Sequence, residues 1–86
     1  SNPDLRVARS LAALFNPLLY PGVGQVLRIT QQELANLVGL SRQRVNEALS
    51  VLQRERVIQI EYGGLRVLDL EALRYGQFSS PRKAVA

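Results

Sequence analysis

The stretch Thr30–Gln53, TQQELANLVGLSRQRVNEALSVLQ, decides the fold because it contains two short amphipathic patterns separated by a glycine. Thr30, with Glu33 three residues later, has the spacing of a capping box, in which two side chains satisfy backbone donors that a helix start leaves free. We therefore expect a helix over residues 31–38. Its apolar residues fall on one face at helical spacing, so this face is expected to be buried: Leu34, Ala35, Val38.

Gly39 and Ser41 separate this helix from a second one. Gly39 follows the last apolar residue, where the chain must take the left-handed conformation that glycine adopts without steric penalty. Ser41 is a typical N-cap residue. After it, apolar residues recur at i, i+3, i+4 and i+7: Val45, Ala48, Leu49, Leu52. Two short helices joined by a tight turn predict a helix-turn-helix, here over residues 30–56.

The residues before this motif predict a leading helix, a loop and a short strand. Asn-Pro-Asp at residues 2–4 is a helix-start signature, and the apolar spacing predicts a helix within residues 1–15. Residues 16–25 contain two Pro and two Gly, which is typical of a loop. Val26–Ile29 has the composition of a short strand leading to Thr30.

The residues after the motif predict a hairpin. Two β-branched runs, VIQIEY and LRVL, flank Gly63-Gly64, a strong signal for a two-residue turn within a hairpin over residues 57–68. A turn centred on the two glycines would give three facing pairs: Tyr62–Leu65, Glu61–Arg66, Ile60–Val67. The side chain of Tyr62 is expected to pack within the protein. Asp69 is expected to cap a short helix over residues 69–75, and residues 76–86 are expected to form a flexible tail.

The order of these elements predicts an α+β fold, mainly α, as a single domain over residues 1–86. The fold is a winged helix-turn-helix with a small antiparallel β-hairpin as the wing. A chain of 86 residues with 47% hydrophobic residues is sufficient for one modest core.

Composition excludes several function classes and favours a nucleic-acid partner. The chain has no His and no Cys, its seven acidic residues are scattered, and no nucleophile has a neighbouring base. We therefore expect no enzyme activity, no catalytic residue and neither a metal nor a cofactor in this fragment. The net charge of +4 and the pI of about 10.4 are typical of nucleic-acid binders. A winged-helix protein–protein interaction module without DNA binding remains the alternative.

The outward face of the second helix carries the side chains that match DNA base edges. Amides of Gln43 and Asn46 can each contact adenine at two points, and Arg can do so with guanine. A second set is expected to contact phosphates, which position a protein without reading sequence: Thr30, Ser41, Arg44, Arg54, Arg66.

Residues 30–62 resemble the C-terminal DNA-binding domain of the cyclic-AMP receptor/fumarate-nitrate regulator (Crp/Fnr) family of bacterial transcription regulators. The most specific part is SRQRVNEALSVLQRERVI, and the similarity extends over about residues 5–68. The resemblance implies that the base-reading positions are Arg42, Gln43, Asn46 and Glu47. Many members carry Glu where Gln43 stands and Arg where Glu47 stands. Arg56 stands in a turn where the family often has Gly or Asn, and a left-handed Arg costs on the order of 1 kcal/mol.

The resemblance also implies partners. Double-stranded DNA is the expected ligand, and the full-length protein is expected to be a cytoplasmic homodimer with an effector-sensing domain upstream of this fragment. The loop 16–24 lies where the resembling activators contact RNA polymerase, although we favour an ordinary connector there.

Overall fold

The structure, a computed structural model, describes residues 2–15 and 26–76. The predicted loop over 16–25, including the candidate polymerase-contact loop 16–24, lies outside the described residues, as does the predicted tail after residue 76. In the described part, four helices accompany a three-stranded sheet. In chain order the elements are α1 (Pro3–Leu14), β1 (Val26–Leu27), α2 (Gln31–Val38), α3 (Arg42–Arg54), β2 (Ile58–Glu61), β3 (Gly64–Val67) and α4 (Leu70–Tyr75).

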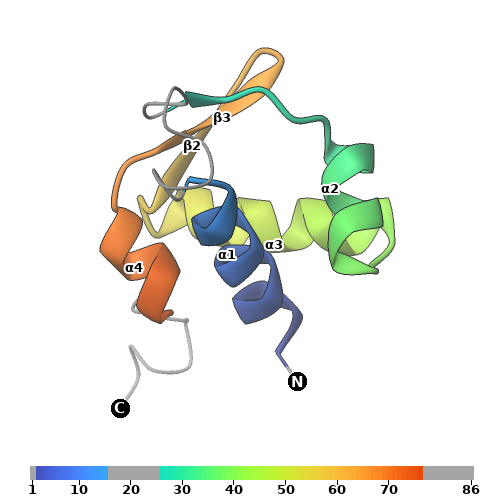
Figure 1. Cartoon of the computed structure of the whole chain (residues 1–86), viewed down its shortest axis with the longest axis horizontal. Coiled ribbons are helices and arrows are strands. Elements are labelled where there is room, and N and C mark those ends of the chain that lie inside the picture. Colours follow the sequence, from blue (N-terminus) through green and yellow to red (C-terminus); the bar gives the residue numbers. More distant parts are fainter. Residues whose placement is uncertain (1, 16–25, 77–86) are drawn as a thin grey trace.

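The helices pack around α1, which contacts α2, α3 and α4. Figure 1 shows α1 crossing α3, with α2 near the start of α3 and α4 on the opposite side of the molecule. The predicted apolar faces of α2 and α3 are buried as expected. Full burial of a Leu side chain contributes about 1.5–3 kcal/mol, and several leucines share this core: Leu11, Leu34, Leu49, Leu52, Leu73. No helix of the described residues is long and apolar enough to cross a membrane.

The helix boundaries are set by the predicted local signals. Thr30 Oγ1 accepts from Glu33 N at 3.0 Å, and Glu33 Oε1 accepts from Thr30 N at 2.8 Å, so the capping box is complete. Gly39 ends α2 in the left-handed region with φ 73°. Side chains also cap the other helices as predicted: Asn2 for α1, Ser41 for α3 and Asp69 for α4.

The predicted register of the hairpin is wrong by two residues. The turn is centred on Tyr62 and Gly63, where Gly63 has φ 72°, and Gly64 lies within β3 opposite Glu61. The observed pairs replace those expected from a Gly63-Gly64 turn: Ile58–Val67, Gln59–Arg66, Ile60–Leu65, Glu61–Gly64.

The pairing of β1 with β3 gives the physical reason for this register. β1 pairs antiparallel with β3, so the strand order is β1-β3-β2. A Cβ atom at Gly64 would lie 2.7 Å from the Leu27 carbonyl oxygen, so the close approach of β1 requires glycine there. One glycine therefore serves the turn and the other serves the strand contact, which the sequence pattern alone does not distinguish.

A shift of two residues keeps every side chain on its predicted face, because side chains alternate with a period of two. Glu61 and Arg66 are no longer directly opposite but remain neighbours, and Arg66 Nε donates to Glu61 Oε2 at 2.7 Å. The expectation that Tyr62 packs is wrong, because the turn exposes its side chain completely.

Candidate nucleic-acid interface

The first turns of α3 present most of the predicted base-reading residues to solvent. Arg42, Gln43 and Glu47 are exposed, whereas Val45 between them is fully buried. The buried stripe fixes the rotation of α3 about its axis, so these three side chains project from the outer face. The structure thus brings them together on one exposed surface.

Asn46 differs from the other three predicted readers. Its side chain is partly buried, and its Oδ1 atom is buried without a hydrogen-bond partner among the described residues. A two-point contact with adenine uses both the oxygen and the nitrogen of the amide. Asn46 would therefore have to rotate outward before it could make such a contact.

Two hydroxyl groups of the predicted phosphate set lie at helix starts. Thr30 and Ser41 are exposed, and each hydroxyl oxygen already accepts a backbone N–H of its own helix. A hydroxyl that accepts at its oxygen can still donate its O–H. Ser41 can therefore donate to a phosphate oxygen without losing its capping role, whereas the Thr30 hydroxyl also bonds the Glu33 carboxylate and would have to exchange that bond for one to a phosphate.

The three predicted phosphate-binding arginines have different environments. Arg54, in the last turn of α3, is exposed. Arg66 is paired with Glu61 in the wing. Arg44 is paired with Asp4 of α1 at 2.9 Å and with Glu47 at 3.3 Å. Two of the three guanidinium groups therefore have carboxylate partners within the protein.

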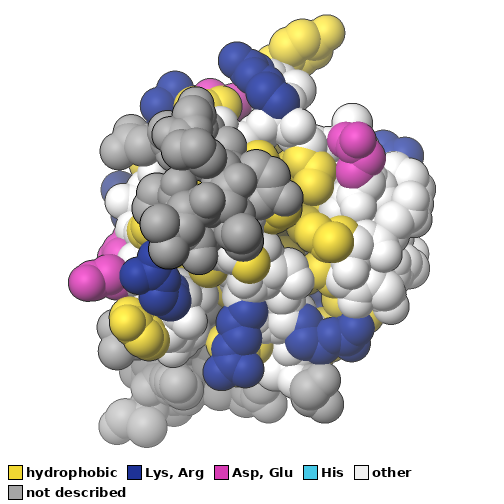
Figure 2. Space-filling view, viewed as in Figure 1, with side chains coloured by type: hydrophobic (Ala, Val, Ile, Leu, Met, Phe, Trp, Pro, Cys, Tyr) yellow, Lys and Arg dark blue, Asp and Glu magenta, His cyan; other side chains and the backbone are white. Residues whose placement is uncertain are grey.

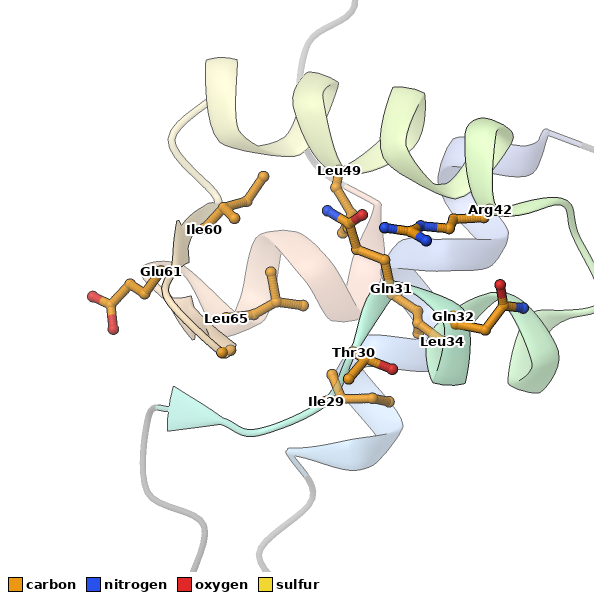
Figure 3. Close-up of a pocket in the computed structure, with 12 residues that line it drawn as sticks. Ile29, Thr30, Gln31, Gln32, Leu34, Arg42, Leu49, Ile60, Glu61 and Leu65 are labelled. Atoms are coloured by element: carbon orange, nitrogen blue, oxygen red, sulfur yellow. The ribbon is translucent and has the colours of Figure 1, made fainter.

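A pocket of about 420 Å³ lies where α2, α3 and the wing meet. Its polar rim includes Thr30, Gln31 and Arg42, and Figure 3 shows the Arg42 side chain extending from α3 over the pocket toward Gln31. Figure 2, drawn from the side on which α1 lies in front of α3, shows apolar side chains in the hollow between the wing and α2 and basic side chains spread over that side of the molecule. Arg42 has no ion pair with any acidic side chain of the described residues.

Three side chains that the sequence analysis did not single out connect the elements of this surface. Gln53 Oε1 accepts from Ile60 N at 2.7 Å and ties α3 to β2. Arg28 Nη1 donates to the Tyr62 carbonyl at 3.2 Å and ties the end of β1 to the wing turn. Arg6 Nη2 donates to the Val38 carbonyl at 2.6 Å, which satisfies a free acceptor at the end of α2.

Those three contacts join residues between 7 and 34 positions apart. No local spacing rule connects such pairs, so the sequence carried no signal for them.

Among the titratable groups of the surface, the hydrogen bonds from the backbone and side chain of Thr30 lower the pKa of Glu33 below its ordinary value of 4.5. Glu33 therefore stays ionised as the acceptor of the capping box.

The fold and this surface together define a winged helix-turn-helix domain. In the described residues, no cluster of three or more His, Cys, Asp or Glu side chains is placed to hold a metal ion. The architecture is that of proteins that place an exposed recognition helix in the DNA major groove.

Comparison with known proteins identifies the family. The Crp-like helix-turn-helix domain matches residues 5–75, and the chain belongs to this family. Transcriptional regulator SdrP of Thermus thermophilus is 38% identical over 71 residues, which are 80% of this chain and 35% of SdrP. The resemblance to the Crp/Fnr family is thus confirmed, and the chain is a DNA-binding domain of the transcription-regulator type, not an enzyme.

Solved structures agree with this assignment. The crystal structure of Thermus thermophilus catabolite activator protein matches with a TM-score of 0.69 and 34% identity, over 86% of this chain and 34% of that chain. Reduced CprK in the absence of any ligand matches with a TM-score of 0.66 at 21% identity, over 86% of this chain and 37% of that chain, and supports the fold alone. The chain spans about a third of the length of these relatives.

Proposed function

We propose that this domain binds double-stranded DNA sequence-specifically and is the DNA-reading part of a bacterial transcription regulator. The observation that carries the proposal is the start of α3, where Arg42, Gln43 and Glu47 are exposed together on a helix oriented by a buried apolar stripe. Winged-helix family membership supports DNA binding, and these side chains supply the chemistry for reading bases.

The proposed recognition places the first turns of α3 in the major groove. The amide of Gln43 would pair with N6 and N7 of an adenine, and Arg42 would reach a guanine or a phosphate. Glu47 would accept from a cytosine amino group and would also repel phosphates of misaligned sequences. Asn46 is a further base-reading position, provided that its side chain rotates outward.

The proposed phosphate contacts hold the domain in register on the duplex. Hydroxyls of Thr30 and Ser41 at the starts of α2 and α3, together with Arg54 at the end of α3, bracket the base-reading residues along the surface. Arg44 and Arg66 would complete the set after exchanging their carboxylate partners for phosphates. Contacts of this kind add affinity that is independent of sequence.

The experiment that tests the proposal begins with selection of bound sites from random duplex DNA. On the selected site, Gln43→Ala should weaken binding by roughly 1–3 kcal/mol and should change binding to random DNA much less. Arg54→Ala is the matched control, because it should weaken binding to the selected site and to random DNA alike. It should also flatten the dependence of log K on log salt by about one unit. Absence of binding at low salt would favour the protein–protein interaction module instead.

The remaining expectations about the whole protein are part of the same proposal. It would act as a cytoplasmic homodimer, with its effector sensed by a domain outside this chain, and no cofactor is expected within these residues. Contact with RNA polymerase through the loop 16–24 is also a proposal, and it would be tested by substitutions that reduce transcription while leaving DNA affinity unchanged.

A further inference from the structure

An acidic side chain of α1 forms an ion pair with an arginine of α3. Arg44 Nη2 donates to Asp4 Oδ1 at 2.9 Å, across 40 positions of sequence. The side chains of Arg44 and Asp4 are only 31% and 23% exposed. Because a charge-assisted contact of this kind is partly shielded from water, it is less screened than an exposed ion pair.

The same guanidinium has a second acidic neighbour. Arg44 Nη1 lies 3.3 Å from Glu47 Oε1. One positive charge thus lies between two negative charges, so Arg44, Asp4 and Glu47 together carry a net charge of −1 in the DNA-free protein. The guanidinium fork binds a carboxylate and a phosphate with the same geometry, so the two compete for it.

We propose that Asp4 acts as an internal phosphate mimic that holds Arg44 and restrains the affinity of the domain for DNA. This inference rests on the proposed DNA binding. For Arg44 to bind a phosphate, the contact with Asp4 must break, and the released carboxylate then repels the nearby DNA backbone. Both effects lower affinity for duplexes of any sequence, because phosphate contacts do not read bases.

The position of Asp4 gives this contact a regulatory consequence. Asp4 lies in the first turn of α1, where Asn2 Oδ1 accepts from Asp4 N at 2.9 Å and fixes the helix start. A displacement of this turn relative to α3 would release Arg44 without any change in α3 itself. The start of α1 can therefore adjust DNA affinity from outside the recognition helix.

The test compares two neutralising substitutions with the same effect on net charge. Asp4→Asn removes the restraint, and Glu71→Gln is the matched control because Glu71 occupies the equivalent second position of α4 and is exposed. Affinity for random-sequence duplex DNA is measured against salt concentration by fluorescence anisotropy. Asp4→Asn should bind roughly three- to tenfold tighter near 0.1 M salt, with a salt slope steeper by about one unit, whereas Glu71→Gln should leave the slope unchanged.

A double-mutant cycle separates release of Arg44 from a general charge effect. In an Arg44→Gln background, Asp4→Asn should no longer steepen the salt slope. Asp4→Ser provides a second neutral variant that suits a helix start, and thermal unfolding verifies that each variant is folded. If the unaltered protein binds DNA but Asp4→Asn binds no more tightly than Glu71→Gln, this inference alone is overturned. If the unaltered protein binds no duplex, the proposed function fails as well.

Discussion

The Asn46 side chain is expected to lower the stability of the fold and to contribute to the reading of DNA bases. Its Oδ1 atom is buried without a partner in the described structure. An unsatisfied buried acceptor destabilises a fold, and Asn has a lower helix propensity than Ala. This cost to stability is consistent with a role of Asn46 outside the fold, such as the base contact proposed above.

We therefore predict that Asn46→Ala raises the stability of the domain by about 0.5–1 kcal/mol while it weakens binding to the selected DNA site. Asn36→Ala in α2 is the control, because Asn36 is exposed and its Oδ1 accepts from Gln32 at 3.1 Å. Chemical denaturation and DNA titration measure the two effects. A loss of stability in Asn46→Ala would show that the side chain contributes to packing.

Arg56 carries backbone strain that the sequence analysis anticipated. It has φ 62° and is the one non-glycine residue with positive φ in the described part of the chain. An L side chain in this conformation costs roughly 1–2 kcal/mol, part of which glycine recovers despite its larger loss of backbone entropy.

We predict that Arg56→Gly stabilises the domain by about 0.5–1 kcal/mol. The neighbouring Arg54→Gly should have the opposite sign, with a loss of about 1 kcal/mol, because residue 54 is still helical. Equilibrium unfolding of both variants gives the comparison. Equal destabilisation by the two substitutions would mean that the left-handed turn is not strained.

At the scale of the elements, the capping box of α2 predicts a defined response to acid. The folded state holds the pKa of Glu33 below its ordinary value of 4.5 through hydrogen bonds with Thr30. A lowered folded-state pKa means that the stabilisation is complete above the ordinary value and is lost as pH falls through the folded value.

We therefore predict that the thermal midpoint falls below about pH 4.5 in part through Glu33, and that Glu33→Gln reduces this pH dependence. Thr30→Ala removes the other half of the box and should cost about 1 kcal/mol near neutral pH. Thermal scans from neutral to acidic pH measure both effects. An unchanged acid response in Glu33→Gln would contradict the assignment.

The same elements show which parts of the structure could be predicted from sequence. Caps, helix spans and buried faces followed from residues within one or two turns of each other, as at Thr30 and Gly39. The wing register did not, because it depends on β1 approaching Gly64 from 37 positions away in the chain. The pairing of Arg44 with Asp4 escaped prediction for the same reason, since helix periodicity does not report which helices meet.

At the scale of the whole molecule, the number of phosphates that the basic side chains neutralise determines how strongly salt should weaken binding. If the domain neutralises about four phosphates, log K should fall with log salt with a slope of roughly −3 to −4. Anisotropy titrations between low and physiological salt measure this slope. A slope near zero would mean that phosphates contribute little and that the basic surface has another partner.

The size of the domain limits one copy to one segment of major groove. α3 has 13 residues, and at about 1.5 Å per residue it is roughly 20 Å long, which is shorter than a turn of DNA. A single copy should therefore bind one half-site weakly.

Two copies joined by a flexible Gly/Ser linker should bind inverted half-sites whose centres are about 34 Å apart, with an affinity roughly 10²–10⁴ times that of one copy. Insertion of about five base pairs between the half-sites turns one of them to the opposite face of the duplex, so most of this gain should be lost. Competition titrations of the tethered pair against both spacings measure the difference, and equal affinity for the two duplexes would contradict paired recognition by α3.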